Sequence, residues 1–418
     1  MISDLAVIGV LENGLSKLDE GRAPQSLPPR PKSSAPDERD WNLSGRAARR
    51  LQSGPISLRT NRSQEFLRHR RTGTGGHMRP LLLGALVGVV FGWSSAGAEA
   101  QDPEELFRKI SPSVVVIRAK GRAVDSTRGL VTFSEIGSGV LISADGKVMT
   151  AAHVVHAMDE IVVELPGGET VPARVVASEP AADLGLLQLA RIPKGAQPAR
   201  LGDSYKVRVG QQVLVIGAPY GLSHSFSAGW ISAKWLPNTA YRAMPLAEFF
   251  QTTATINTGN SGGPMFNMAG EVIGVVSHNI SRSGGSEGLG FVVTMKSARY
   301  FLMEREWAWI GLEGKVVTGE LAEIFNVPGG SGLLVSVVPM GSPAWDMGLA
   351  GGDRTATIGG QQIVVRGDIV LSMAGIAIKS EADIPKIRER IGAMSTGQPF
   401  KASVLRAGKL IELMGKAP

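Results

Sequence analysis

Short apolar runs broken by turn residues recur through residues 101–300, and they restrict the possible folds more than any other feature of the chain. The runs are rich in β-branched residues, and Gly, Pro, Asp or Asn separates each run from the next. Segments this short, without long helical patterns between them, indicate an antiparallel sandwich or barrel and not a βαβ fold. The expected strands cover residues 136–142, 148–150, 161–165, 173–177, 184–189, 212–216 and 272–276.

Composition and charge narrow the class of protein further. The 418 residues suffice for two or three domains, and an apolar content of 43% is typical of globular proteins. Of the net charge of +7, residues 1–77 supply +5 with 13 basic and 8 acidic residues, so residues 101–418 carry only +2. This balance does not indicate a nucleic-acid partner. Cysteine is absent, which excludes disulfides and thiolate zinc sites.

Two N-terminal segments precede the strand-rich region. Residues 1–77 are rich in Arg, Ser, Pro and Gly without periodicity, so we expect a disordered basic extension, which a misassigned start codon would explain. Residues 78–100 combine a positive start, an uncharged apolar centre and small residues at the end, the pattern of a cleaved signal peptide. The alternative is that residues 80–98 remain as a membrane anchor. Both interpretations export residues 101–418.

The sequence TGNSGGP at residues 258–264 places one serine among glycines. Glycine lets the backbone turn sharply and approach a substrate closely. If Ser261 is a nucleophile, the amides of Gly259 and Ser261 can converge on a carbonyl oxygen as it becomes negative, which makes them an oxyanion hole. A serine hydroxyl is a weak nucleophile at neutral pH, so the chain must also supply a base and a group that orients the base.

Two upstream segments supply these groups. TAAHVV at residues 150–155 contains His153 after a strand-like run, and DLGLLQL at residues 183–189 opens an apolar run with Asp183. The order His153, Asp183, Ser261 is that of the chymotrypsin-like triad and differs from the subtilisin and α/β-hydrolase orders. In such a triad His153 takes the Ser261 proton, while Asp183 orients the imidazole and stabilises its charged form.

The local sequences resemble those of a known family. TAAHVV and GNSGGP resemble the histidine and serine motifs of trypsin-like proteases, and DLGLLQL resembles the aspartate motif of the HtrA/Deg branch. The resemblance implies a mostly β fold over residues 101–300, a chymotrypsin-like double antiparallel barrel with the triad between its two halves. It also implies a homotrimer or a multiple of trimers, assembled through the N-terminal segments of the protease domains, here around Leu106, Phe107 and Ile110. Further family-like segments are GSGV at 137–140, LGDS at 201–204, GAPYG at 217–221 and GLGF at 288–291.

The resemblance also implies where substrate specificity arises. In this superfamily the residues just before the serine line the first specificity pocket, which here are Thr255, Ile256 and Asn257. No acid stands there, so selection for Lys or Arg is not expected. Ile256 indicates a small aliphatic residue on the acyl side of the cleaved bond.

The remaining histidines have plainer interpretations. His156 follows His153 by three residues, a spacing that fits two metal ligands on a helix, but no acidic partner accompanies it and we expect a surface histidine. We expect His224 and His278 to be loop residues, either of which could border the substrate cleft. Nothing in the sequence calls for a metal or a cofactor.

Residues 304–415 resemble the PDZ domain of HtrA/Deg proteases, through segments such as GLLVSVV at 332–338. The segment of Trp309, Ile310, Gly311 and Leu312 matches the carboxylate-binding loop, whose amides receive a peptide C-terminus. Alternatively, Trp307 and Trp309 are core or interface aromatics. Two Gly-Asp pairs flank residues 354–366, which we interpret as an inserted loop or hairpin.

These features together predict an exported, periplasmic and ATP-independent serine endopeptidase of protein quality control. Its partners would be unfolded polypeptides as substrates and peptide C-termini at a regulatory PDZ domain, with membrane contact only if residues 80–98 are retained. The alternative from another class is a PDZ-bearing chaperone or adaptor with a latent protease domain. A third interpretation is esterase-type acyl transfer, although the lack of a GxSxG elbow disfavours an α/β-hydrolase.

Overall fold

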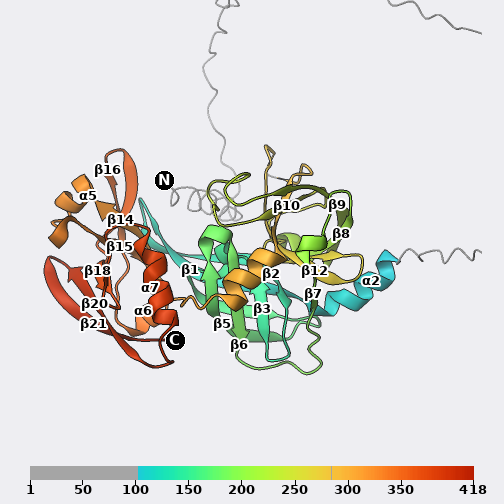
Figure 1. Ribbon diagram of the computed structural model, residues 1–418, viewed down its shortest axis with the longest axis horizontal. Coiled ribbons are helices and arrows are strands. Elements are labelled where there is room, and N and C mark those ends of the chain that lie inside the picture. The colour runs from blue at the N-terminus through green and yellow to red at the C-terminus, as the bar shows by residue number, and fades with distance from the viewer. Residues whose placement is uncertain (1–101, 284) are drawn as a thin grey trace, which may run out of the picture. The chain divides into compact units, whose positions relative to one another are not determined.

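The computed structural model describes residues 102–283 and 285–418 (Figure 1). The predicted extension at residues 1–77 and the predicted signal peptide or anchor at residues 78–100 lie outside the described residues. Within the described ranges, no helix has the length and apolarity needed to cross a membrane. By their mutual contacts, all described residues fall in the same compact unit.

The first antiparallel barrel closes in the strand order β1-β2-β3-β6-β5-β4, drawn in cyan and green in Figure 1. Each strand of this barrel buries some of its side chains in the core and leaves others closer to the solvent. In β4, Met158, Ile161 and Val163 are buried, while the residues between them are more exposed. Its strands are β1 (Val114–Asp125), β2 (Gly129–Leu141), β3 (Lys147–Thr150), β4 (Met158–Glu164), β5 (Thr170–Glu179) and β6 (Leu184–Leu189).

A second six-stranded antiparallel barrel follows, in the order β11-β8-β9-β10-β13-β12, and the β11–β12 pairing closes it. The short strand β7 (Arg200–Leu201) adds to β12 in parallel. The six strands of the second barrel are β8 (Gln212–Gly217), β9 (Ser225–Trp235), β10 (Phe249–Thr252), β11 (Pro264–Asn267), β12 (Glu271–Asn279) and β13 (Gly290–Thr294). Helix α4 (Met295–Arg299) then leads out of this barrel. The predicted chymotrypsin-like double barrel is confirmed.

One apolar core joins the two barrels. The same buried cluster contains Val140 and Met149 from the first barrel and Leu214, Phe249 and Phe266 from the second. Burial of this much apolar surface holds the barrels against each other, because separating them would expose these side chains to water. The segment that carries Ser261 lies at this junction, where the Ser138 amide of the first barrel donates to the Ser261 carbonyl.

Helix α2 (Pro103–Ile110) precedes the first barrel and is capped by Asp102, whose side chain accepts from the Glu104 amide. Leu106 and Ile110 are buried in the chain's own core. These two side chains are therefore covered within the single chain, and trimer assembly around this segment stays a prediction. Phe107 is partly buried and packs edge to face on Phe226, with 5.7 Å between ring centroids.

The C-terminal domain contains a separate sheet with the strand order β14-β15-β18-β20-β21, in which β19 also pairs with β18. Residues 354–366 contain an antiparallel hairpin of their own, β16 with β17. The strands are β14 (Glu313–Thr318), β15 (Ser331–Val337), β16 (Arg354–Ile358), β17 (Gln361–Val365), β18 (Ile369–Met373), β19 (Ile376–Ala377), β20 (Pro399–Arg406) and β21 (Lys409–Lys416). The helices are α5 (Gly319–Ile324), α6 (Pro343–Asp346) and α7 (Asp383–Gly392).

A glycine lets the serine loop approach the first barrel closely. Gly262 has a φ of +82°, and a Cβ atom there would overlap Thr150 Oγ1 and the Ser138 carbonyl of the first barrel. The Ser138 amide also donates to the Ser261 carbonyl at 2.8 Å. Backbone atoms cannot move aside as a flexible side chain can. Position 262, where the serine loop meets the first barrel (the glycine seam), therefore accommodates only glycine.

We therefore predict that Gly262→Ala destabilises the full-length protein by about 2 kcal/mol or more, because a steric overlap adds to the cost of a positive φ. The matched control is Gly168→Ala, since Gly168 has a similar φ of +86° but a Cβ placed there would meet no atom within 4 Å. Only the backbone cost of about 1 kcal/mol applies there. Urea unfolding followed by tryptophan fluorescence measures both, and equal losses would contradict the packing argument.

Candidate active site

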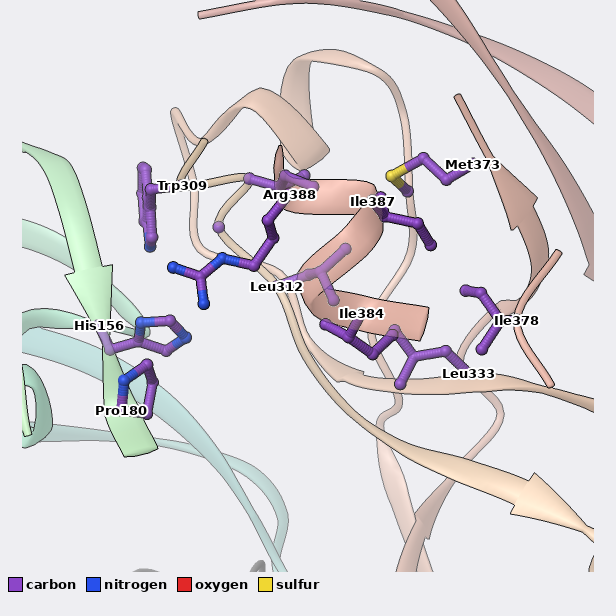
Figure 2. Close-up of a pocket in the computed structure, with 12 residues that line it drawn as sticks. His156, Pro180, Trp309, Leu312, Leu333, Met373, Ile378, Ile384, Ile387 and Arg388 are labelled. Atoms are coloured by element: carbon purple, nitrogen blue, oxygen red, sulfur yellow. The ribbon is translucent and has the colours of Figure 1, made fainter. Parts of the chain in front are cut away.

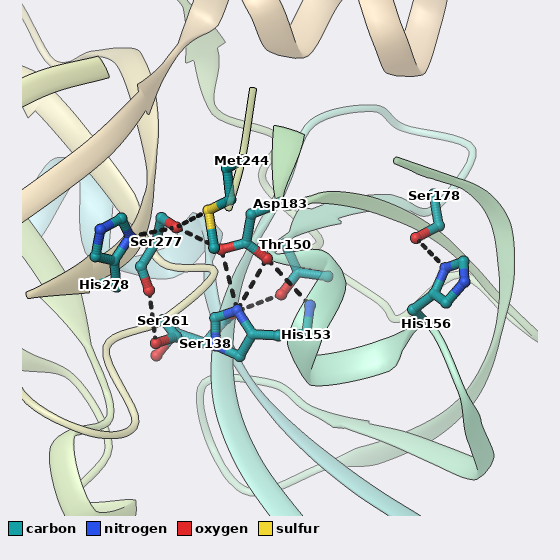
Figure 3. Close-up of polar contacts among 10 residues, drawn as sticks. All are labelled: Ser138, Thr150, His153, His156, Ser178, Asp183, Met244, Ser261, Ser277 and His278. Atoms are coloured by element: carbon teal, nitrogen blue, oxygen red, sulfur yellow. Dashed lines mark hydrogen bonds and ion pairs between the residues drawn. The ribbon is translucent and has the colours of Figure 1, made fainter. Parts of the chain in front are cut away.

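Asp183 lies at the end of the 3₁₀ turn Pro180–Ala182, immediately before β6, and is only 1% exposed. Its φ of +53° is in the left-handed region, which Asp tolerates better than most residues other than glycine. Figure 3 shows its carboxylate between His153 and Ser277. A buried carboxylate in this position needs hydrogen-bond donors around it.

His153 supplies two of those donors. It lies on helix α3 (Ala152–Val155), directly after β3, and its backbone amide donates to Asp183 Oδ1 at 3.1 Å. Its ring Nδ1 is 2.9 Å from Oδ1 and 3.0 Å from Oδ2 (Figure 3). An ionised carboxylate can only accept, so Nδ1 carries the proton and Nε2 of the neutral ring is free to take one. This tautomer is the one a general base requires.

Ser261 lies in the loop between β10 and β11, beside this pair. Its Oγ donates to the Ser277 carbonyl at 3.0 Å. Across the part of the chain that the structure describes, no hydrogen bond joins Ser261 Oγ to His153. The structure therefore has the predicted acid and base already paired, with the predicted nucleophile next to them and turned toward β12.

Hydrogen bonds hold the serine loop in place around Gly259. The Tyr220 amide donates to the Thr258 carbonyl at 2.9 Å, and Ser138 Oγ donates to the Gly259 carbonyl at 2.7 Å. These bonds fix the peptide groups on either side of Gly259, whose φ is +98°. The amides of Gly259 and Ser261 have no acceptor among the described residues. Such donors, held in place without a partner, suit a developing oxyanion.

The surroundings of the Asp183–His153 pair keep the Asp183 carboxylate charged. Burial disfavours the Asp183 carboxylate, but His153 and the donated hydrogen bonds outweigh it and lower the Asp183 pKa. Desolvation likewise disfavours the charged imidazole of His153, yet Asp183, with a smaller contribution from Glu135, raises the His153 pKa. The His153 side chain is 39% exposed and the Asp183 side chain 2%. Proton transfer is therefore available to a substrate at His153 and not at Asp183.

Ser277 is a site residue that sequence reasoning missed. Its Oγ donates to Asp183 Oδ2, and its carbonyl accepts from Ser261 Oγ. The signal was present as one small hydroxyl at the end of the apolar run 272–276. Its significance was not apparent because β12 is remote in sequence from Asp183.

The three residues predicted to line the specificity pocket do not share one environment. Thr255 is exposed, and its amide donates to Ser227 Oγ at 2.7 Å. Ile256 is 1% exposed and packs in the core of the second barrel. Asn257 is partly buried, and its side-chain Oδ1 has no partner among the described residues.

The other histidines also depart from expectation. His156 is partly buried and not a surface residue: its Nδ1 is 2.8 Å from Ser178 Oγ, and burial, with Arg388 nearby, lowers its pKa to about 4. His278 is not a loop residue, because it lies within β12. His224 does lie outside the strands, with a φ of +58°.

A separate groove is lined on one side by the predicted carboxylate loop, β15 and α7 of the C-terminal domain, and on the other by His156 and Pro180 of the protease domain (Figure 2). Gly311 has a φ of +72°, and its carbonyl accepts from Ser342 Oγ at 3.0 Å. In the described chain the amides of Ile310, Gly311 and Leu312 have no acceptor. The aliphatic and methionine side chains that the C-terminal domain contributes to the lining are Ile310, Leu312, Leu333, Met373, Ile378, Ile384 and Ile387.

The groove lining includes the Arg388 guanidinium and Trp309, and Trp307 lies beside Arg388. Arg388 donates to the Glu179 carboxylate at 2.7 Å and to the Ser178 carbonyl at 2.6 Å. Trp307 is buried beneath the guanidinium groups of Arg305 and Arg388, with Arg388 4.6 Å from its ring centroid. Trp309 packs against the apolar core of the first barrel. Both tryptophans are thus packed aromatics, while the loop backbone remains available.

The site geometry predicts how His153 titrates. In NMR titrations of the full chain, the His153 ring should titrate above the ordinary value of 6.5, because protonation gains the attraction of Asp183. Asp183→Asn removes that charge and should lower the midpoint. The control is Asp145→Asn, an exposed carboxylate that is not among the groups shifting His153. A midpoint equally affected by both variants would contradict the assignment.

Comparison with known proteins agrees with this geometry. A family model described as a trypsin-like peptidase domain matches residues 137–275. A probable periplasmic serine endoprotease DegP-like from Pseudomonas putida (strain F1) is 38% identical over 282 residues, which cover 66% of this chain and 54% of the relative. The corresponding protein of Ectopseudomonas mendocina (strain ymp) is 37% identical over 294 residues, covering 68% and 57%.

The chain spans about half the length of the curated relatives it matches. Among solved structures, the HtrA-type protease AlgW with decapeptide is 26% identical and covers 75% of this chain and 97% of its own, but a TM-score of 0.43 is too low to support a conclusion. The sequence relatives, the peptidase-domain match and the double barrel agree. The chain belongs to the HtrA/Deg family of trypsin-like serine proteases.

Proposed function

We propose that this protein is an exported, ATP-independent serine endopeptidase that cleaves unfolded or misfolded polypeptides in protein quality control. The observation that carries the proposal is the oriented Asp183–His153 pair beside Ser261, together with the amides of Gly259 and Ser261, which have no acceptor among the described residues. The relatives named DegP-like periplasmic serine endoproteases support both the reaction and a periplasmic location. They favour catalysis over the chaperone or adaptor alternative.

The reaction would begin when the Ser261 hydroxyl leaves the Ser277 carbonyl and turns to His153 Nε2. As Ser261 Oγ attacks the substrate carbonyl carbon, its proton passes to Nε2, and the amides of Gly259 and Ser261 stabilise the oxyanion. Asp183 stabilises the imidazolium, which then protonates the leaving amine. Water, deprotonated by His153, hydrolyses the acyl-enzyme and restores Ser261.

We also propose that the protease prefers a small aliphatic residue on the acyl side of the cleaved bond. Ile256 is apolar, and Thr255 and Asn257 bring no acid to the loop before the serine. Since Ile256 is packed in the core, it would act by shaping the pocket wall and not by offering an open surface.

The C-terminal domain, residues 304–415, would be a PDZ domain that regulates the protease. Its groove has apolar walls and three unpaired amides at one end, which suit the side chains and terminal carboxylate of a peptide. A homotrimer is also proposed. Phe107 on α2 and Phe226, which is 42% exposed, supply apolar surface for it, whereas Leu106 and Ile110 do not.

Loss of the nucleophile is the direct test of the reaction. Ser261→Ala in the full chain should reduce casein hydrolysis on the order of 10⁴-fold or more, because no other hydroxyl can form the acyl-enzyme there. Ser395→Ala, an exposed serine of the C-terminal domain, should leave the rate unchanged. Cleavage by Ser261→Ala at the parent rate would exclude this serine as the nucleophile.

Peptide binding at the groove is tested in the Ser261→Ala variant, so that the peptides are not cleaved. A fluorescent peptide with an apolar end and a free terminal carboxylate should bind at least about tenfold more tightly than its amide, since charged hydrogen bonds to the loop amides are lost in the amide. Gly311→Ala should abolish this difference, because its Cβ would overlap Ser342. Gly329→Ala, at φ +78° with open space, is the control. Equal binding of both peptides would exclude carboxylate recognition.

A further inference from the structure

A histidine that the proposed mechanism does not use stands behind the triad. His278 follows Ser277 in β12, where the pairing with β13 shifts register between Val276 and His278. In a regular strand, consecutive side chains point to opposite faces. A bulge breaks that alternation and redirects side chains. Here it lets His278 Nδ1 lie 3.0 Å from Ser277 Oγ (Figure 3).

The direction of each hydrogen bond follows from counting protons. Ser277 has one hydroxyl proton, and an ionised Asp183 can only accept, so that proton goes to Asp183 Oδ2. Toward His278, Ser277 Oγ is then left with lone pairs alone. His278 Nδ1 must therefore carry a proton and donate it. A continuous chain of donors runs from His278 through Ser277 to the carboxylate that orients His153.

Packing holds the His278 ring in this position. The ring lies nearly parallel to Phe291, with 5.1 Å between centroids, and contacts the rings of Tyr241 at 4.5 Å and Phe249 at 5.5 Å. Asp183 and His153 are the charged groups that act on it. Burial lowers the His278 pKa to about 4, so the ring is neutral at neutral pH.

The arrangement leaves one polar atom without a partner. His278 Nε2 is closed off from solvent and makes no hydrogen bond within the described residues. A buried, unpaired acceptor is unfavourable, and a phenyl ring would fill the same aromatic site without that cost. A purely structural role does not account for a histidine here, whereas the bond from Nδ1 to Ser277 does.

We propose that His278 is a positioning residue for the triad: it donates to Ser277 and, through that hydroxyl, holds the Asp183 carboxylate in place against His153. The inference rests on the proposed function, since it concerns the same triad. Polarised from behind by two linked donors, the carboxylate shares its negative charge between Ser277 and His153. His153 is thereby kept from becoming so basic that it stays protonated at neutral pH.

The tautomer of His278 is measured first, by ring ¹⁵N shifts in the full chain carrying Ser261→Ala. We expect Nδ1 to be protonated and Nε2 bare. In the same background, His278→Phe keeps an aromatic ring but removes the donor, and should raise the His153 titration midpoint by about 0.5 on the pH scale. His278→Asn, whose amide nitrogen can occupy the place of Nδ1, should restore the parent midpoint.

A double-mutant cycle tests the route through Ser277. Ser277→Ala should raise the His153 midpoint at least as much as His278→Phe, and combining the two should add nothing, because His278 acts only through Ser277. Additive shifts would overturn the proposal. So would an unprotonated Nδ1, or an unchanged midpoint in a folded His278→Phe protein. The tautomer measurement needs no change at position 278 and decides the question even if that variant does not fold.

These readouts do not depend on hydrolysis, so the two proposals can fail separately. If the parent cleaves no peptide bond in a Ser261-dependent way, the proposed function is wrong, while the His278–Ser277–Asp183 chain is still judged by NMR. If the parent is active, His278→Phe should lower kcat/KM about threefold on the acidic limb, matching the shift in midpoint. A lower kcat/KM on the acidic limb without any shift in the His153 titration midpoint would indicate a structural effect instead.

Discussion

The buried negative charge of Asp183 is the constraint on which the rest of the protease site depends. A carboxylate at 1% exposure is unfavourable unless donors surround it. Its donors come from α3, through the backbone and ring of His153, and from β12, through Ser277. The first barrel supplies two of these donors and the second barrel supplies the third, so the charge is satisfied only when both barrels have formed and met along their shared apolar core.

Ser277 connects the two halves of the site through one residue. Its hydroxyl belongs to the Asp183 environment, while its carbonyl holds the Ser261 hydroxyl. A displacement of β12 would therefore reach the acid and the nucleophile together. The glycine seam at Gly262 and the Ser138 bonds to the serine loop restrict such a displacement from the opposite side. The loop is held by backbone contacts more than by its own side chains.

The sequence predicted what is local and missed what is assembled by distant segments. Short β-branched runs are enough to indicate strands, and His153, Asp183 and Ser261 each lie in a distinctive local motif. The residues missed or misplaced have no such motif: Ser277 was missed and His278 was expected in a loop, and both lie in β12, where the register shifts at a bulge. A bulge adds one residue to one strand, and apolar periodicity alone does not reveal it.

The left-handed backbone at Asp183 has a consequence for how this fold can change over generations. At φ +53° only Gly, Asn and Asp are comfortable, so the substitutions tolerated at this position are few. Asparagine is one of them, and a single base change separates its codons from those of aspartate. Its amide could donate to Ser277, which would then donate to His278 in turn. A lineage that abandoned hydrolysis and kept the scaffold for binding could thus pass through position 183 without refolding its barrels.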